Sequence, residues 1–283
     1  MKVTLHKLGR ASEGQGFLAK KGAEQDEAEP YTKMQFDYYE AKADRWTAED
    51  RNFVVGLFDE HNEASCYDVM LEGFDTLKMK MLDFGCGPAR NIVKLAPKFS
   101  VIDGADISLK NLQKAEFWIR QNFMQDENLF REDQEINLYQ CNGVDLAEIK
   151  RDQYDMVYST IVLQHLPIHK LRLRYFKEFF RVLKPGGWIS LQMGFGRGPR
   201  SDRITVGYHD NKWGARGTNG RCDVSIDDPE DLRKDIEDEV GFENFSYSMS
   251  HPIPRDSETH TNWIYFRAQK PKFDPVNYLS SMD

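Results

Sequence analysis

The chain has 283 residues, with 46 acidic and 38 basic side chains and a formal net charge of −8. This length allows one large domain with additions or two small domains, and it is sufficient to bury one substantial core. The acidic balance argues against a protein that binds the phosphate backbone of nucleic acids over a broad surface, because such proteins are usually basic.

The cysteines and the apolar runs limit the cellular setting. The four cysteines form no C-x-x-C pair, so they indicate neither a disulfide framework nor a zinc site: Cys66, Cys86, Cys141 and Cys222. The N-terminus lacks the apolar core of a signal peptide, and no apolar run approaches about 18 residues. These features predict a cytoplasmic, soluble protein without a membrane segment.

The N-terminal part of the chain divides into two. Residues 1–30 are rich in Gly, Lys, Glu and Ala with few large apolar side chains, and we expect a flexible segment there. Over residues 31–61, apolar side chains including Phe36, Tyr39 and Trp46 recur at spacings of three and four, which predicts a helical region. This helical region either belongs to the core or covers a ligand as a lid.

Strand and helix patterns alternate over most of the remaining chain. Apolar runs predict strands at 79–84, 101–106, 136–141, 154–160, 187–193, 242–249 and 261–268. Helical periodicity predicts helices near 89–97, 109–124, 169–183 and 229–240. The alternation predicts a doubly wound α/β fold with a mainly parallel, seven-stranded sheet. Because only a loop separates the last two strands, we expect an antiparallel last strand.

The domain organisation follows from this pattern. We expect one domain over residues 31–270 and a C-terminal tail at 271–283. Residues 194–226 form a long insertion between a strand and the next helix, rich in Gly, Arg, Asp and Asn. A loop of this length in a compact domain is usually a lid, a binding loop or a small subdomain.

The most informative stretch is MKMLDFGCGPARN at residues 79–91. An apolar strand leads into a turn through Gly85 and Gly87, and a helix is expected to begin near Ala89. Glycines let the backbone approach a ligand closely, and a helix start presents unpaired N–H groups, so this arrangement is typical of a cofactor site. The dinucleotide pattern G-x-G-x-x-G is broken, because Arg90 stands in place of its third glycine.

The sequence resembles the class I S-adenosylmethionine-dependent methyltransferases, over roughly residues 60–270. The resemblance rests on five blocks in the family's order: LDFGCGP at 82–88, GADIS at 104–108, YDMVYS and VLQHL at 154–166, RVLKPGG at 181–187, and VGF at 240–242. It implies a Rossmann-like methyltransferase sheet, S-adenosyl-L-methionine as cofactor, a helical lid at 31–61 and a substrate-side insertion at 194–226.

The resemblance also implies roles for individual residues. The glycine turn would hold the methionine end of the cofactor, and Asp106 would accept hydrogen bonds from both ribose hydroxyls. Asp83 would face the cofactor's amino group. The adenine would contact the segment after the next strand, and the cofactor would lie above the end of the strand that follows. The full set of expected cofactor residues is Asp83, Gly85, Gly87, Asp106, Ile107, Asn142, Gly143, Val144, Thr160 and Ile161.

Each of these polar residues also has a purely structural interpretation. Asp106 would be a helix N-cap, Asp83 would brace the turn, and Asn142 would be a turn-forming residue. Asn142 departs from the acidic residue that the family often has at this position, although an Asn carbonyl can accept the same hydrogen bond.

Candidates for catalysis and substrate binding are less clearly marked. His165, His209 and Asp210 could serve as a general base if the acceptor must lose a proton. Tyr208, Trp213 and Arg216 on the insertion would form a substrate clamp, or this segment would be a solvated polar loop. No carboxylate–histidine cluster at ligand spacing indicates a metal.

The favoured function is therefore in-line transfer of a methyl group to a small molecule or a sugar or glycan. A modifier of RNA or protein is the alternative, although the motif Asn-Pro-Pro-Tyr is absent and STIV stands at 159–162. A catalytically silent binding module is the third possibility, which the intact Gly85, Gly87 and Asp106 disfavour. The sequence does not indicate an oligomeric state.

Overall fold

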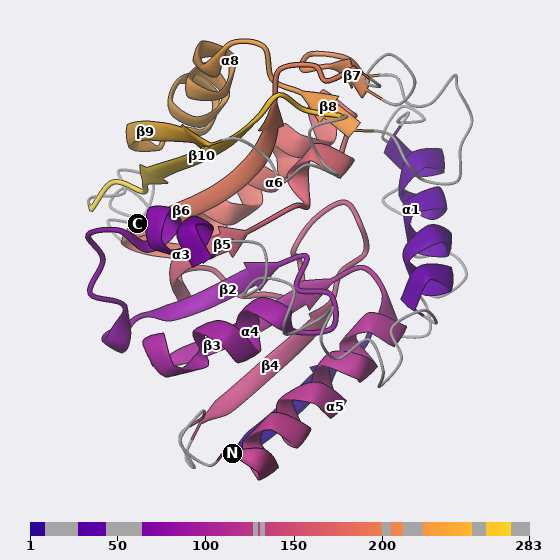
Figure 1. Ribbon diagram of the computed structural model, residues 1–283, viewed down its shortest axis with the longest axis vertical. Coiled ribbons are helices and arrows are strands. Elements are labelled where there is room, and N and C mark those ends of the chain that lie inside the picture. Colours follow the sequence, from indigo (N-terminus) through magenta and orange to yellow (C-terminus); the bar gives the residue numbers. More distant parts are fainter. Residues whose placement is uncertain are drawn as a thin grey trace, which may run out of the picture.

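The computed structural model describes residues 1–8, 28–43, 64–126, 130, 134–199, 205–211, 223–250 and 259–272 (Figure 1). The strands are β1 Lys2–His6, β2 Lys80–Phe84, β3 Val101–Asp106, β4 Glu135–Gln140, β5 Tyr154–Ser159, β6 Leu183–Phe195, β7 Thr205–Gly207, β8 Asp223–Ser225, β9 Glu243–Ser250 and β10 Asn262–Gln269. The longer helices are α1 Ala28–Ala43, α3 Ala64–Leu71, α4 Arg90–Leu95, α5 Leu109–Gln125, α6 His169–Val182 and α8 Pro229–Arg233. Four short segments, η3 Thr76–Lys78, η4 Ala96–Lys98, η5 Leu163–His165 and the π-helical η6 Lys234–Val240, complete the order.

The main sheet confirms the doubly wound fold. It has eight strands in the order β1-β4-β3-β2-β5-β6-β10-β9. β1 to β6 are parallel, whereas β10 pairs antiparallel with both β6 and β9. The antiparallel finish is as predicted, because the short loop between β9 and β10 leaves no room for a crossover helix.

The eighth strand corrects the expectation of a flexible segment at 1–30. Residues 2–6 form β1 at the sheet edge, where Val3 lies opposite Ile136 in a parallel pair with β4. Val3 is buried, and the backbone nitrogen of Lys2 donates to the carbonyl of Gln134. Val and Leu alternate with polar residues in this short strand, a pattern too brief to stand out in a segment rich in Gly and Lys.

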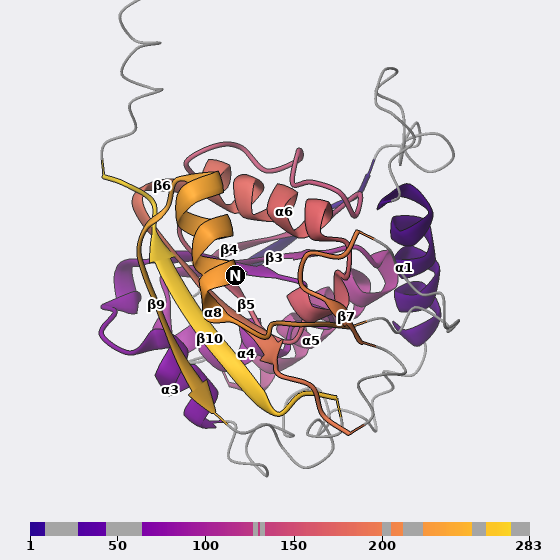
Figure 2. The same cartoon turned by 90° about the horizontal axis from the view of Figure 1, so that it is seen from above.

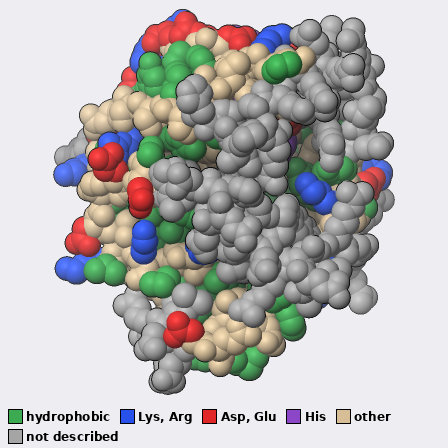
Figure 3. Space-filling view, viewed as in Figure 1, with side chains coloured by type: hydrophobic (Ala, Val, Ile, Leu, Met, Phe, Trp, Pro, Cys, Tyr) green, Lys and Arg blue, Asp and Glu red, His purple; other side chains and the backbone are tan. Residues whose placement is uncertain are grey.

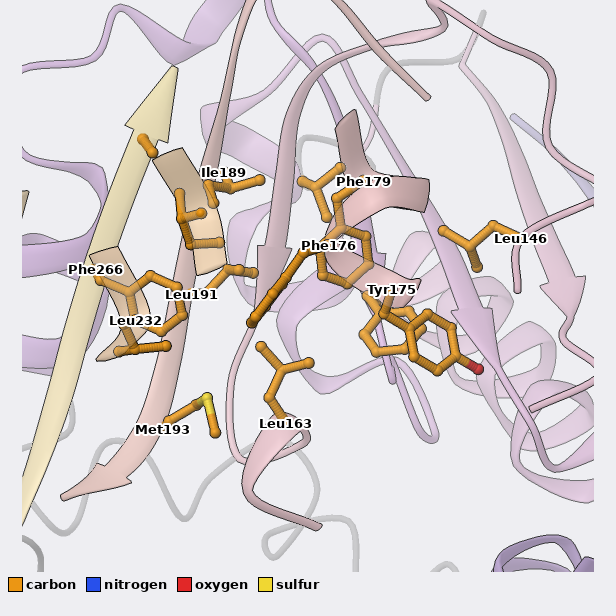
Figure 4. Close-up of a cluster of buried hydrophobic side chains, with 14 of the residues drawn as sticks. Leu146, Leu163, Tyr175, Phe176, Phe179, Ile189, Leu191, Met193, Leu232 and Phe266 are labelled. Carbon is orange, nitrogen blue, oxygen red and sulfur yellow. The ribbon is translucent and has the colours of Figure 1, made fainter. Parts of the chain in front are cut away.

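Helices cover both faces of the sheet, as Figure 2 shows. On one face, Leu82 and Val157 belong to a core that includes α6, whose Phe176 and Phe179 are fully buried. Figure 4 shows side chains of α6, β6 and β10 meeting in this core, with Leu163 beside Phe176. On the other face, side chains of α3, α4 and α5 form a second core. Because both faces are covered, the central strands bury successive apolar side chains on opposite faces, as Met81 and Leu82 do in β2.

α1 and the described part of the insertion lie on one side of the sheet. α1 lies at the right of Figures 1 and 2, on the side where β7 and β8 also lie. Residues 44–63, including Trp46, lie outside the described residues. In the insertion, β7 and β8 form a small parallel sheet, and Ile226 bridges to Phe195 at the end of β6. The insertion is therefore attached directly to the main sheet.

The surface shows two features that bear on partners. In the part of the chain that the structure describes, no helix is long and apolar enough to cross a membrane. On the face in Figure 3, acidic side chains gather over α8, and Lys and Arg side chains are interspersed with acidic ones elsewhere. The described residues of this face therefore form no broad basic surface.

Candidate functional site

A cavity of about 290 Å³ lies at the carboxyl ends of the parallel strands. Ligands in open α/β sheets usually bind at this edge. The wall combines backbone from the turns with side chains from α1 and the loop after β5. Its lining residues include Gly85, Gly87, Asp106, Ile107, Gly143, Thr160, Ile161 and His165, all expected from the sequence, together with Tyr31, Thr32, Gln35, Tyr39, Lys42, Arg90, Asn91 and Cys141.

The glycine turn uses conformations that few other residues adopt. Gly85 and Gly87 have φ angles of +72° and +52°. The backbone nitrogen of Gly85 donates to the carbonyl of Ala105, which ties the turn to β3. A Cβ on Gly85 would lie 2.4 Å from Val162, whereas a Cβ on Gly87 would meet nothing within 4 Å. The space above Gly87 is thus open towards the cavity that this residue lines.

The carboxylate of Asp106 is fixed at the end of β3. One oxygen accepts from the backbone nitrogen of Gly87 at 2.9 Å, and the other accepts from that of Ser108 at 2.8 Å. Burial raises the pKa of Asp106, and these backbone hydrogen bonds oppose the rise. The N-cap of α5 is Ser108, which accepts from Asn111, so the interpretation of Asp106 as the cap is wrong.

Asp83 lies behind the cavity wall and does not line it. It is completely buried, and its Oδ1 accepts from the side-chain amide of Asn91 at 3.1 Å. The same amide lies 3.2 Å from the Thr160 hydroxyl, and the Asn91 carbonyl accepts from Tyr67. Burial raises the pKa of Asp83 to about 7. Asn91 both donates a hydrogen bond to this carboxylate and lines the cavity, so it connects Asp83 to the cavity wall.

The expected adenine contact through Asn142 is wrong in its geometry. The side-chain carbonyl of Asn142 accepts from the backbone nitrogens of Val144 and Asp145, each at 2.9 Å. This is the turn-forming role that the sequence left as the alternative. Neither Asn142 nor Val144 lines the cavity, and Cys141 and Gly143 form the wall instead.

The end of β5 supplies a strained part of the wall. Thr160 and Ile161 both line the cavity, as expected. Ile161 has a φ of +58°, a left-handed conformation that costs a β-branched residue roughly 1–2 kcal/mol. Such backbone strain clusters at binding sites, because the surrounding structure must maintain it.

Of the three candidate bases, only His165 lines the cavity. Its Nδ1 lies 2.5 Å from the Oδ1 of Asp223, the first residue of β8 in the insertion. His209 is largely exposed and contacts Asp231 at 3.1 Å. Asp210 accepts from the backbone nitrogen of Gly207, three residues before it, within its own turn. Neither residue is placed beside the cavity.

The expected substrate clamp is corrected as well. Tyr208 is buried, its hydroxyl donates to Asp235 at 2.5 Å, and the guanidinium of Arg172 lies over its ring. A tyrosine on a polar segment looked exposed in sequence, but the tertiary structure uses it as an anchor for the insertion. Trp213 and Arg216 lie outside the described residues.

α1 closes the cavity on the side away from the sheet. Tyr31, Gln35, Tyr39 and Lys42 line it at spacings of three and four, so they share one helix face. The hydroxyl of Tyr31 donates to the backbone carbonyl of His165, which joins α1 to the loop after β5. This part of the predicted helical region therefore contacts the site.

Part of the chain matches a known family. Residues 82–191 match a family model described as a methyltransferase domain. They include the glycine turn, Asp106 and the loop after β5. This segment is therefore similar to methyltransferase domains, in agreement with the resemblance seen in the sequence. A search of curated protein sequences finds no match.

Several solved structures of other proteins share the fold of this chain. A SAM-dependent methyltransferase from Methanosarcina mazei is 20% identical, with a TM-score of 0.50, and the match covers 69% of this chain and 94% of that one. Phosphoethanolamine N-methyltransferase 2 of Haemonchus contortus is 16% identical, with a TM-score of 0.54 and coverage of 82% and 60%. The [4+2]-cyclase SpnF is 16% identical, with a TM-score of 0.50 and coverage of 73% and 80%. The same fold thus also serves another reaction.

The residues of the cavity are compatible with S-adenosylmethionine, the cofactor that the family resemblance implies. The open space above Gly87 suits a ligand that lies against the backbone, and a Cβ there would enter that space. Asp106 presents a buried carboxylate, which can accept hydrogen bonds from hydroxyl groups.

Several residues at this site were not predicted from the sequence, among them Asn91, Asp223 and Thr32. Asn91 is the second residue of α4, and a polar residue at a helix start is too common to indicate a site. Asp223 contacts His165 from 58 residues away along the chain. Thr32 belongs to α1, and no local pattern indicates that it contacts Gly143.

Proposed function

We propose that the protein transfers the methyl group of S-adenosylmethionine to a small molecule, or to a sugar or glycan of similar size. When bound, the cofactor supplies a methyl group on a positively charged sulfur, which makes the methyl carbon electrophilic. The protein's own contribution is to align the acceptor with that carbon, since positioning can supply several kcal/mol.

In this proposal, the glycine turn and Asp106 hold the cofactor. Asp106 accepts from the ribose hydroxyls, and Gly87 leaves room for the methionine part over the turn. Gly143 and Ile107 border the adenine, and Thr160 with Ile161 lies beneath the reacting end. Asp83 acts through Asn91, whose amide it holds at 3.1 Å.

The observation that carries the small-molecule proposal is the position of α1. One face of this helix lines the cavity, and its Thr32 approaches Gly143 so closely that a Cβ on that glycine would lie 2.3 Å from the Thr32 side chain. An acceptor must therefore fit between α1 and the sheet. A folded protein or an RNA duplex could place only a single side chain or a flipped base in such a space.

An RNA or protein substrate remains the second candidate. The net charge of −8 argues against it for RNA, because RNA binding draws its affinity largely from basic side chains. The acidic side chains over α8 argue in the same direction.

The test is a binding and transfer experiment on the full chain. Isothermal titration should show binding of S-adenosylmethionine and no tight binding of a nicotinamide dinucleotide. Labelled S-adenosylmethionine is then incubated with metabolite and sugar-nucleotide pools, with total RNA and with protein extract in parallel. Label in a small molecule supports the proposal, whereas label in RNA or protein alone favours the second candidate. Cofactor binding without transfer to any pool supports a silent module.

A further inference from the structure

His165 and Asp223 form a pair that links the cavity to the insertion. The imidazole Nδ1 lies 2.5 Å from the carboxylate Oδ1, and the pair is partly buried. A carboxylate oxygen can only accept this hydrogen bond, so Nδ1 carries the proton that is donated. In a neutral imidazole this leaves the lone pair on Nε2. Among the described residues, Nε2 has no hydrogen-bond partner, and the ring lines the cavity.

The backbone around His165 is held from three sides. Its nitrogen donates to the carbonyl of Val162, and its carbonyl accepts from the Tyr31 hydroxyl. Arg172, which is fully buried, donates to the neighbouring carbonyl of Leu166. When the backbone of a loop is fixed in this way, a single hydrogen bond is sufficient to orient a side chain on it. The loop therefore has the rigidity that a proton-transfer group requires.

Asp223 is fixed in turn by its surroundings. β8 is attached to the main sheet, because the nitrogen of Gly196 donates to Ile226 and the Ser225 hydroxyl donates to the carbonyl of Gly196. The second carboxylate oxygen faces His260, whose Nε2 lies 3.9 Å away. Burial lowers the pKa of His260, so this neighbour favours the neutral form. His165 and His260 are thus two titratable groups that face this carboxylate.

The charges of the cavity wall limit the acceptor. Lys42 and Arg90 are its cations, and Asp106 is the only acidic residue among the described lining residues. An ammonium acceptor would meet these cations and the positive sulfur of the cofactor without a free carboxylate to pair with. An uncharged hydroxyl group meets no such penalty.

We propose that His165, oriented by Asp223, is the general base of the reaction and that the acceptor is a hydroxyl compound. This inference rests on the proposed function. The acceptor oxygen would form a bond to the methyl carbon while the carbon–sulfur bond breaks. The electron pair of the broken carbon–sulfur bond would stay on sulfur. The hydroxyl proton passes to Nε2 of His165 and then to solvent. Asp223 is a positioning residue, because it acts only through the imidazole.

The first test is nuclear magnetic resonance of protein labelled with ¹⁵N-histidine, at pH 8.5 where histidines are neutral. His165 should show a protonated Nδ1 and an unprotonated Nε2 in the free protein. Asp223→Leu removes the acceptor and should lose this single tautomer, whereas Asp227→Leu, at an exposed acid four residues on, should keep it. A protonated Nε2 in the wild type, or an unchanged tautomer in Asp223→Leu, would overturn the proposal.

The second test places the ring relative to the methyl group. With S-adenosylmethionine carrying a ¹³C-methyl group, a nuclear Overhauser contact between that methyl and the His165 ring is expected. Its absence from a complex that isothermal titration shows to be saturated overturns the base while leaving the proposed function intact. If the cofactor does not bind at all, the proposed function fails, and the tautomer result stands separately.

The third test uses the acceptors found in the metabolite and sugar-nucleotide pools. His165→Gln should lower kcat by about 10² to 10⁴, as expected for the loss of a general base, with cofactor affinity unchanged. His209→Gln, the exposed rival, should retain wild-type kcat. The methylated products should carry a new O-methyl group. N-methylated products, or equal kcat in His165→Gln and wild type, would contradict the proposal.

Discussion

The carboxylate of Asp106 accepts a hydrogen bond from the backbone nitrogen of Gly87 at 2.9 Å. This contact joins the end of β3 to the glycine turn after β2, two segments 19 residues apart in the chain. The carboxylate also accepts from Ser108, so backbone N–H groups on two sides orient it. The proposed cofactor site is thus organised by the protein's own hydrogen bonds.

Asp106→Ala should weaken S-adenosylmethionine binding at least about tenfold, which corresponds to about 1.4 kcal/mol. The reason is the loss of charge-assisted hydrogen bonds to the ribose and of the contact with Gly87. Isothermal titration measures the change. Asp68→Ala, an exposed acid on α3, is the matched control and should bind normally. An unchanged affinity in Asp106→Ala would sink the ribose assignment.

Gly87→Ala separates cofactor binding from folding. The new Cβ meets no protein atom within 4 Å. The free energy of unfolding should therefore fall by only about 1 kcal/mol, which is the cost of backbone strain at a positive φ. Because the Cβ enters the cofactor space, affinity for S-adenosylmethionine should fall at least about tenfold. Thermal unfolding and isothermal titration measure the two effects.

Gly73→Ala is the control for this pair of measurements. Gly73 has a φ of +80° and equally open surroundings, but it does not line the cavity. It should show a similar loss of stability with unchanged cofactor affinity. A parallel loss of affinity in both variants would mean that strain alone accounts for the effect of Gly87→Ala.

Binding of S-adenosylmethionine near pH 7 should release protons from Asp83. Burial raises the pKa of this carboxyl to about 7, so a large part of it is protonated in the free protein. A cation in the cavity favours the ionised form, lowers the pKa in the complex and thereby expels the proton. Titration calorimetry in buffers of different ionisation enthalpy counts the protons.

The sign of this linkage is tested with Asp83→Asn. Wild type should release more protons per bound cofactor than the variant at pH 7, and the difference should vanish at pH 9, where Asp83 is ionised in both states. Equal proton release in the two proteins at pH 7, or greater uptake by the wild type, contradicts the assignment.

Arg172→Met should destabilise the fold by about 2–5 kcal/mol. The guanidinium is fully buried and donates to the carbonyls of Leu166 and Tyr208, which would both lose their partner. Denaturant unfolding measures the change. Arg174→Met, on the same helix, removes an exposed pair with Asp145 and should cost less than about 1 kcal/mol. Similar losses in both variants would show that burial at Arg172 is not the cause.

Local patterns in the sequence predicted most of the fold. The strands from 79 to 268 and the helices between them follow from apolar periodicity, which is a property of neighbouring residues. The glycine turn was recognisable because glycines such as Gly85 and Gly87 readily adopt the positive φ angles that a tight turn needs. The short loop before the last strand likewise required an antiparallel finish. These features needed no knowledge of distant contacts.

The directions of side chains were decided only by the tertiary structure. Asn142 turns into its own loop, Tyr208 is buried against Asp235, and β1 adds an eighth strand by pairing with β4. Asp223 reaches His165 across 58 residues. Such contacts depend on how whole elements pack, and no local pattern carries that information. The sequence by itself therefore determined the fold and suggested the cofactor, because both follow from local patterns, whereas packing decided which side chains face the cavity.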